Sequence, residues 1–253
     1  MVRAARPDED LAWLGVLEGA ELFAGIDAAG WDASCWILSA MYVSDPVSSA
    51  LTHDDVRKIE IAAGASEPVI IGSVNLDEVV PTTGGGLGYA PKPGGDWSRV
   101  RWADYRRDLA RVATESQVPP CFRWVRPESW PANVEPPTEG SLDQTSFVAL
   151  LATLAEVGGG WESDVIAFYG GGASGDWSEE LHIWSGPLGA VAELVRLYGF
   201  TPSNLWPRDR SWFVYTDYDL WGTKVSGSRR LIRRIRSNGE LETLRWPHPA
   251  DPR

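Results

Sequence analysis

The segment Ser211–Gly227, SWFVYTDYDLWGTKVSG, constrains the fold more than any other part of the chain. Bulky aromatic and β-branched residues precede Asp217 and Asp219, and a shorter run that ends in glycine follows them. Aromatic and β-branched residues favour strands, whereas Asp and Gly favour turns. The pattern predicts a strand over 211–219, a tight turn and a returning strand over 223–226. We therefore expect a β-hairpin at the centre of the second half of the fold.

Further helices and strands are predicted along the rest of the chain. Thr52 and Asp55 come close to the spacing of a capping box, so a helix is expected to begin at Thr52. Apolar residues at helical spacing predict helices over 8–24, 102–114, 142–157, 187–198 and 228–236. Bulky apolar runs predict strands over 33–43, 68–74, 163–169, 180–185 and 241–246. These segments do not alternate as regular βαβ units, so the sequence predicts an α+β fold of mixed, largely antiparallel sheet with flanking helices.

A proline-rich stretch lies near the middle of the chain. Six prolines between Pro119 and Pro137 exclude regular structure over much of it. We place a joint at 131–140, which predicts an acidic α+β subdomain over 1–135 and a second subdomain, with the Trp- and Tyr-rich hairpin, over 141–253. The alternative is that this stretch is an irregular segment packed on the protein, because its Trp and Phe residues do not suit a free linker.

Charge is distributed unevenly along the chain, whose net charge is −12. Residues 1–78 contain 14 Asp and Glu against 4 Lys and Arg, whereas residues 141–253 contain 14 against 11. An acidic face repels nucleic acid and attracts basic proteins, so we expect a basic protein partner and no nucleic acid. Solubility is the alternative explanation of the acidic charge. The basic segment 228–236, SRRLIRRIR, would be either a solvated helix face or a contact for phosphate.

The composition is that of a globular chain without membrane spans. No apolar run reaches the roughly 18 residues that a transmembrane helix needs. Glu18, Glu21 and Asp27 interrupt the apolar stretch near the N-terminus, so it does not have the core of a signal peptide. Cys35 and Cys121 are too few for a disulfide framework. We therefore expect a cytoplasmic protein with reduced thiols and no membrane partner.

Asp217, Asp219 and Lys224 are the candidate catalytic residues. On a strand the two carboxylates would point to one face, where they could bind a divalent metal or act as a base, and Lys224 would hold an anionic group. The alternative is that both Asp residues cap a strand end before a turn. No cofactor is expected, because the glycine string Gly170–Gly175 is followed by another predicted strand rather than by the helix of a dinucleotide site. The three histidines are far apart in sequence, so no metal ligands are assigned.

Tryptophans beside Pro or Gly are the candidate binding residues. The chain has 14 Trp, and exposed Trp residues are frequent anchors of protein interfaces. Covering the protein's own core is the alternative role, because Trp buries a large apolar area. The binding candidates are Trp124, Trp130, Trp177 and Trp206.

The run Asn204–Gly227, NLWPRDRSWFVYTDYDLWGTKVSG, together with Pro136–Asp143, PPTEGSLD, resembles bacterial proteins of actinobacterial type that have no assigned activity. The resemblance covers most of the chain and implies no site residue. We therefore expect a non-catalytic protein-binding module with an acidic face for a basic partner, of which an immunity- or antitoxin-like protein is one version. The alternative is a small-molecule enzyme, with or without a metal, that uses Asp217 and Asp219.

Overall fold

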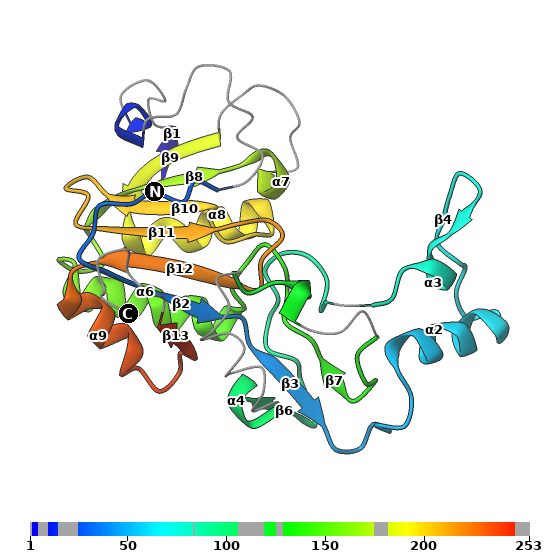
Figure 1. Ribbon diagram of the computed structural model, residues 1–253. Helices are drawn as coiled ribbons and strands as arrows, with labels where there is room; N and C mark the ends of the chain where they lie inside the picture. Colours follow the sequence, from blue (N-terminus) through cyan, green and yellow to red (C-terminus); the bar gives the residue numbers. More distant parts are fainter. Residues whose placement is uncertain are drawn as a thin grey trace.

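An antiparallel sheet of eight strands forms the body of the protein in the computed structural model (Figure 1). The structure describes residues 2–4, 10–14, 25–82, 84–105, 119–124, 129–174 and 182–245. The strands of the large sheet are β1 (Arg3–Ala4), β2 (Ala33–Leu38), β8 (Asp164–Tyr169), β9 (His182–Pro187), β10 (Asn204–Pro207), β11 (Trp212–Thr216), β12 (Gly222–Gly227) and β13 (Thr243–Arg245). Their order is β1-β9-β8-β10-β11-β12-β2-β13, and every neighbouring pair is antiparallel.

The remaining elements are helices and two smaller sheets. The longer helices are α2 (His53–Ala62), α6 (Gln144–Val157), α8 (Val191–Tyr198) and α9 (Arg229–Arg236). Short helical turns are η1 (Ala12–Leu14), α3 (Leu76–Val79), α4 (Trp102–Tyr105), η2 (Phe122–Trp124), α7 (Gly171–Ser174) and η3 (Leu188–Ala190). Strands β6 (Trp97–Val100), β3 (Met41–Ser44) and β7 (Val134–Glu135) form a three-stranded sheet, and β4 (Ile70–Ile71) pairs with β5 (Val74–Asn75). These helices and antiparallel sheets confirm the predicted α+β fold.

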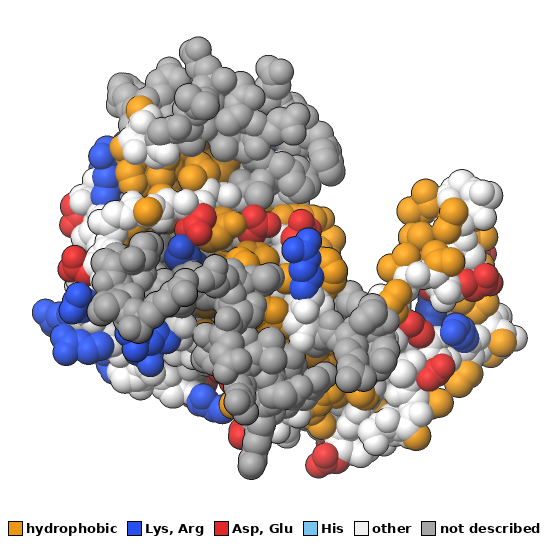
Figure 2. All heavy atoms as spheres, in the orientation of Figure 1, with side chains coloured by type: hydrophobic (Ala, Val, Ile, Leu, Met, Phe, Trp, Pro, Cys, Tyr) orange, Lys and Arg blue, Asp and Glu red, His pale blue; other side chains and the backbone are white. Residues whose placement is uncertain are grey.

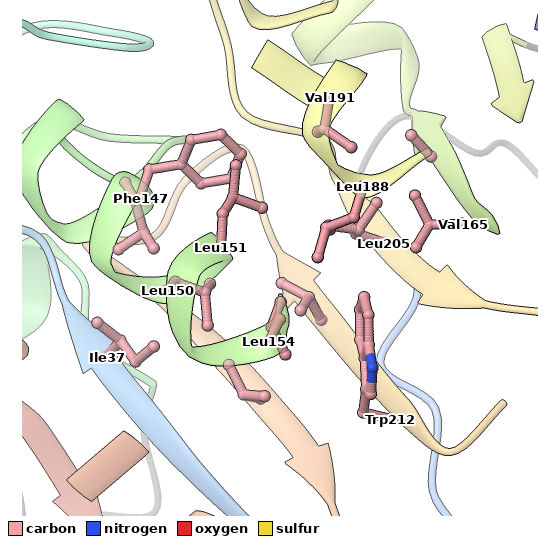
Figure 3. Close-up of a cluster of buried hydrophobic side chains, with 14 of the residues drawn as sticks. Ile37, Phe147, Leu150, Leu151, Leu154, Val165, Leu188, Val191, Leu205 and Trp212 are labelled. Atoms are coloured by element: carbon pink, nitrogen blue, oxygen red, sulfur yellow. The ribbon is translucent and has the colours of Figure 1, made fainter. Parts of the chain in front are cut away.

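Helices α6, α8 and α9 pack on one face of the large sheet and enclose the main core. Phe147, Leu150, Leu151 and Leu154 of α6 point toward the strands, where they meet Leu205 and other buried side chains (Figure 3). Burial of each such side chain stabilises the fold by about 1.5–3 kcal/mol. The main core therefore depends on the apolar stripe that the sequence shows over 142–157.

The opposite face of the sheet is also covered, by aromatic side chains. Along β8 the side chains alternate: Val165 and Ala167 face the helices, whereas Ile166 and Phe168 face the second layer. Trp206 and Phe213 continue that layer, and Trp13 and Trp31 pack on Phe213. Because both faces are buried there, β8 and β11 are apolar on both faces over most of their length instead of alternating with polar residues.

The predicted hairpin is confirmed as β11 and β12. Trp212 pairs with Gly227 and Thr216 with Thr223, and the turn contains Asp217 and Asp219. The hairpin lies inside the large sheet, between β10 and β2. The expectation that this segment is central to the fold is correct.

The expected strand over 33–43 is two strands in two different sheets. The chain leaves β2 at Ser39 and Ala40 and enters β3. The Ser39 hydroxyl donates to the Ser141 carbonyl at 3.0 Å, and the Ala40 amide donates to Asp143 Oδ2 at 2.9 Å. The other oxygen of Asp143 accepts from the Ser146 amide at 3.0 Å and caps α6. One buried carboxylate therefore fixes both the corner and the start of the main helix.

The large sheet does not follow the subdomain boundary expected at 131–140. Strand β2 comes from the first half of the chain and lies between β12 and β13 of the second half. Strand β1 likewise pairs with β9. The division into 1–135 and 141–253 therefore does not describe the large sheet, because hydrogen bonding places β1 and β2 of the first half among the strands of the second half. Residues 131–139 lie against the protein, as the packed alternative predicts.

Candidate interaction surface

The candidate catalytic residues have partners that stabilise the hairpin turn. Asp217 Oδ2 accepts a hydrogen bond from the Tyr215 hydroxyl at 2.8 Å, and Asp217 Oδ1 accepts one from the Asp219 amide at 3.1 Å. Lys224 Nζ contacts both carboxylate oxygens of Asp27, at 2.8 and 3.0 Å. Burial, and then the charge of Asp217, raise the pKa of Tyr215 well above its usual range, so this phenol stays protonated.

These contacts match the structural alternative for Asp217, which closes an Asx turn after β11. Lys224 forms an ion pair with Asp27, whereas the catalytic hypothesis expects it to hold an anionic group beside Asp217 and Asp219. Within the described part of the chain, no group of three His, Cys, Asp or Glu residues is placed to hold a metal ion. The metal-assisted enzyme stays a prediction to which the described contacts add no support.

Three of the four candidate binding tryptophans are buried. Trp124, Trp130 and Trp206 are 6%, 4% and 1% exposed, so no partner can reach their rings in this structure. Trp124 packs edge-on against Trp102, and Trp130 against Trp221. These three tryptophans cover the protein's own core, so the prediction that they bind a partner is corrected. Trp177 lies outside the described residues.

The exposed apolar side chains gather in a segment that the sequence analysis did not single out. Residues 53–80, here called the arm, contain α2, β4, β5 and α3 and project from the body of the protein (Figure 1). Half of the large apolar side chains that are exposed in the described residues belong to it. They are 46–65% exposed: Ile59, Val69, Ile70, Ile71, Val74, Val79 and Val80. Figure 2 shows this apolar surface over the free end of the arm.

The base of the arm is fixed to the body by hydrogen bonds. His53 Nε2 lies 2.7 Å from the Val134 carbonyl, and the His53 amide donates to the Trp130 carbonyl at 2.9 Å. Thr82, just beyond the other end of the arm, donates from its amide and its hydroxyl to Asp54 Oδ1, at 3.0 and 2.8 Å. The bonds between Thr82 and Asp54 join the two ends of the arm to each other, and the Trp130 amide donates to the Thr82 carbonyl at 3.3 Å, so the arm is attached to the body at both ends.

A polar network around Asp77 holds the arm together internally. Asp77 Oδ2 accepts from the Val69 amide at 2.7 Å, and Asp77 Oδ1 accepts from Arg57 Nε at 3.2 Å. The hydrogen bond from Val69, followed by the contact with Arg57, lowers the pKa of Asp77. Arg57 also donates to the Glu67 carbonyl. Helices α2 and α3 contain no buried residue, so the apolar side chains of the arm are not used in a core of its own.

The strand expected over 68–74 is in fact the hairpin of β4 and β5. Gly72 has φ +63°, a left-handed conformation that glycine adopts readily in two-residue turns. Ile71 pairs with Val74 across the turn. A glycine inside an apolar run was the available sequence signal for this turn. Ile70, Ile71 and Val74 stay exposed, because no other sheet in the described residues pairs with this hairpin.

The exposed charges of the arm are mostly acidic. The arm contains six carboxylates, at Asp54, Asp55, Glu60, Glu67, Asp77 and Glu78, against Arg57 and Lys58, which gives a net charge of −4. Glu60, Glu67 and Glu78 are exposed, whereas Asp77 and Arg57 neutralise each other. The arm therefore presents an apolar surface with acidic residues close by.

Comparison with known proteins gives no further guidance: no family model, no curated protein and no solved structure matches this chain. The resemblance to actinobacterial-type proteins stays a prediction. In the described residues no helix has the length and apolar character needed to span a membrane.

Proposed function

We propose that this protein is a binding module that recognises a basic protein through the arm, residues 53–80. The observation that carries the proposal is the set of apolar side chains exposed on a projection that has no core of its own. Exposed apolar patches that are rimmed by polar residues mark interaction sites. A two-stranded hairpin is marginally stable by itself, so β4 and β5 would gain from contact with a partner.

The acidic residues of the arm favour a basic partner over a second copy of the chain. Two arms of net charge −4 repel each other, and the whole chain carries −12. A partner with apolar residues ringed by Lys and Arg would complement both properties of the arm. A stoichiometric inhibitor of a basic protein, as immunity proteins and antitoxins are, is the specific version that we propose. A cytoplasmic location is part of the proposal and agrees with two buried, unpaired cysteines.

The test is a native pull-down from the source cells with the tagged protein and two matched double variants. Ile70→Ser/Ile71→Ser changes two arm side chains that are 58% and 65% exposed. Val148→Ser/Leu197→Ser changes side chains that are 55% and 66% exposed on α6 and α8. The wild type and the helix variant should retain one basic partner in a 1:1 complex, and the arm variant should bind it at least about tenfold more weakly.

The purified complex gives the decisive measurements. Its affinity should fall as the salt concentration rises, because acidic and basic surfaces attract each other. Equal binding by both variants, an acidic partner or no partner would contradict the proposal. A dimer of the protein alone, detected by light scattering and lost in the arm variant, would assign the arm to self-association instead.

A further inference from the structure

A second charged surface lies on α9, which packs beside the large sheet away from the arm (Figure 1). Leu231, Ile232 and Ile235 of this helix are buried in the main core. The five arginines that occupy its other positions are all exposed: Arg229, Arg230, Arg233, Arg234 and Arg236. Figure 2 shows Lys and Arg side chains gathered at this end of the molecule.

An open pocket of about 370 Å³ lies between α9 and the C-terminal end of α6. It is lined by Arg230, Arg233, Arg234, Glu156, Val157 and Ser237. The volume is within the roughly 300–1,000 Å³ of small-molecule sites. The pocket therefore combines space for a small ligand with a high density of guanidinium groups.

The charges in this pocket are not balanced. Arg234 is paired with Glu156 in a bidentate contact, with 3.0 Å between Nε and Oε1 and 2.8 Å between Nη2 and Oε2. Glu156 is the one acid among the lining residues, so three guanidinium charges meet one carboxylate. Arg230 and Arg233 lie one turn apart, where like charges destabilise a helix. The negative C-terminal end of the helix dipole offsets part of this repulsion.

We propose that this pocket binds the phosphate group of a small phosphorylated ligand. A phosphate carries up to two negative charges at neutral pH, which matches the two guanidinium charges left after Arg234 and Glu156 pair. The planar fork of Arg suits bidentate hydrogen bonds to a phosphate. The Ser237 hydroxyl also lines the pocket, and its proton is donated to the Arg234 carbonyl at 3.0 Å, so the guanidinium groups supply the donors for a phosphate.

A small ligand fits this surface better than a nucleic acid. A polyanion would approach a molecule of net charge −12, with Glu156 inside the contact area. A single phosphate group can enter the pocket without extending over the acidic remainder of the surface. The site is separate from the arm, so phosphate binding in this pocket does not depend on the proposed protein partner.

The experiment is calorimetric titration with inorganic phosphate and with pyrophosphate at constant ionic strength. We expect saturable binding at one site per chain. Arg230→Gln/Arg233→Gln should weaken it at least about tenfold, because two charge-assisted contacts are lost. The control Arg196→Gln, which changes an exposed arginine in the last turn of α8, should bind as the wild type does.

The named arginines are exposed, so both variants should fold, and equal melting temperatures would verify this. No saturable binding would overturn the proposal, as would equal binding by Arg230→Gln/Arg233→Gln and the wild type. A DNA duplex titrated at the same ionic strength separates the two sources of phosphate. Tighter binding of the duplex, lost in the double variant, would overturn the small-ligand site in favour of a nucleic-acid contact.

Discussion

Single polar side chains connect segments that are distant in sequence. Asn204, which is fully buried, accepts a hydrogen bond from the Ile26 amide at 2.8 Å and donates to the Ile26 carbonyl at 2.9 Å and the Val214 carbonyl at 3.1 Å. Asp143 similarly links α6 to the corner at Ala40. Buried polar groups of this kind are costly when unpaired, so each fixes the position of the segment that it contacts.

Glu139 is a residue whose charge the fold disfavours. Burial raises the pKa of Glu139, the hydrogen bond from Trp221 Nε1 at 3.0 Å lowers it, and the nearby charge of Asp219 raises it further. A carboxyl whose pKa is raised on folding adds stability below its unfolded pKa, and this stability is lost as the pH rises through the folded pKa. Ionised Glu139 therefore makes the folded protein less stable at neutral pH.

We predict that Glu139→Gln raises the melting temperature at pH 7, because the amide keeps an acceptor for Trp221 and carries no charge. The gain should shrink as the pH falls through the raised pKa of the folded state and disappear below the unfolded pKa near 4.5, where Glu139 is protonated in both states. Thermal unfolding between pH 4 and pH 8 measures this difference in melting temperature. Glu240→Gln, which changes an exposed carboxylate, is the control. A variant that is less stable than the wild type at pH 7 would show that the carboxylate is favoured in the fold.

At the scale of helices and strands, local sequence patterns predicted the elements that carry a capping residue or a bulky apolar run. Helices α2, α6 and α9 begin within two residues of their expected starts, because Thr52, Asp143 and Ser228 cap them. Strands β6 and β7 were not predicted. They are short, and they exist because they pair with β3, which comes from another part of the chain. A pairing of that kind leaves no local pattern in the sequence.

The candidate sites were harder to predict than the elements. The segment PVIIGSV of the arm resembled an ordinary strand in sequence because it is apolar, and its exposure depends on whether another element covers it. The tryptophans beside Pro and Gly resembled surface anchors, yet Trp124 and Trp130 fill a core formed by segments distant in sequence. The exposed arginines of α9, in contrast, follow directly from the spacing of Leu231, Ile232 and Ile235.

Helix α6 offers a test of the main core. Leu150 is fully buried between the helix and the strands (Figure 3), whereas Val148 on the same helix is 55% exposed. Leu150→Ala should lower the free energy of unfolding by about 2–5 kcal/mol, because it removes apolar contacts and leaves a cavity. Val148→Ala should change it by less than about 0.5 kcal/mol. Urea unfolding measures both, and equal losses would show that α6 does not pack as described.

At the scale of the whole molecule, two surfaces of opposite charge belong to different sheets: the arm follows β3 of the three-stranded sheet, and α9 follows β12 of the large sheet. The arm carries net charge −4, and α9 carries five arginines. The two lie on different parts of the body, so a partner on the arm leaves the pocket at α9 open (Figure 2). The large sheet, which carries α9, includes β1 and β2 of the first half of the chain beside strands of the second half.

Strand pairing across the large sheet predicts how the chain behaves when it is divided at residue 140. In a fragment of residues 141–253, β12 loses its neighbour β2, and β13 loses the strand with which it pairs. The apolar side of α9 also loses Cys35 and Ile37, which belong to the same core. We expect this fragment alone to lack the cooperative thermal unfolding of the intact chain, because its core is incomplete. Addition of a fragment of residues 1–140 should restore the near-ultraviolet circular dichroism of the packed tryptophans. Cooperative unfolding of the 141–253 fragment alone, at the melting temperature of the intact chain, would instead support two independent subdomains.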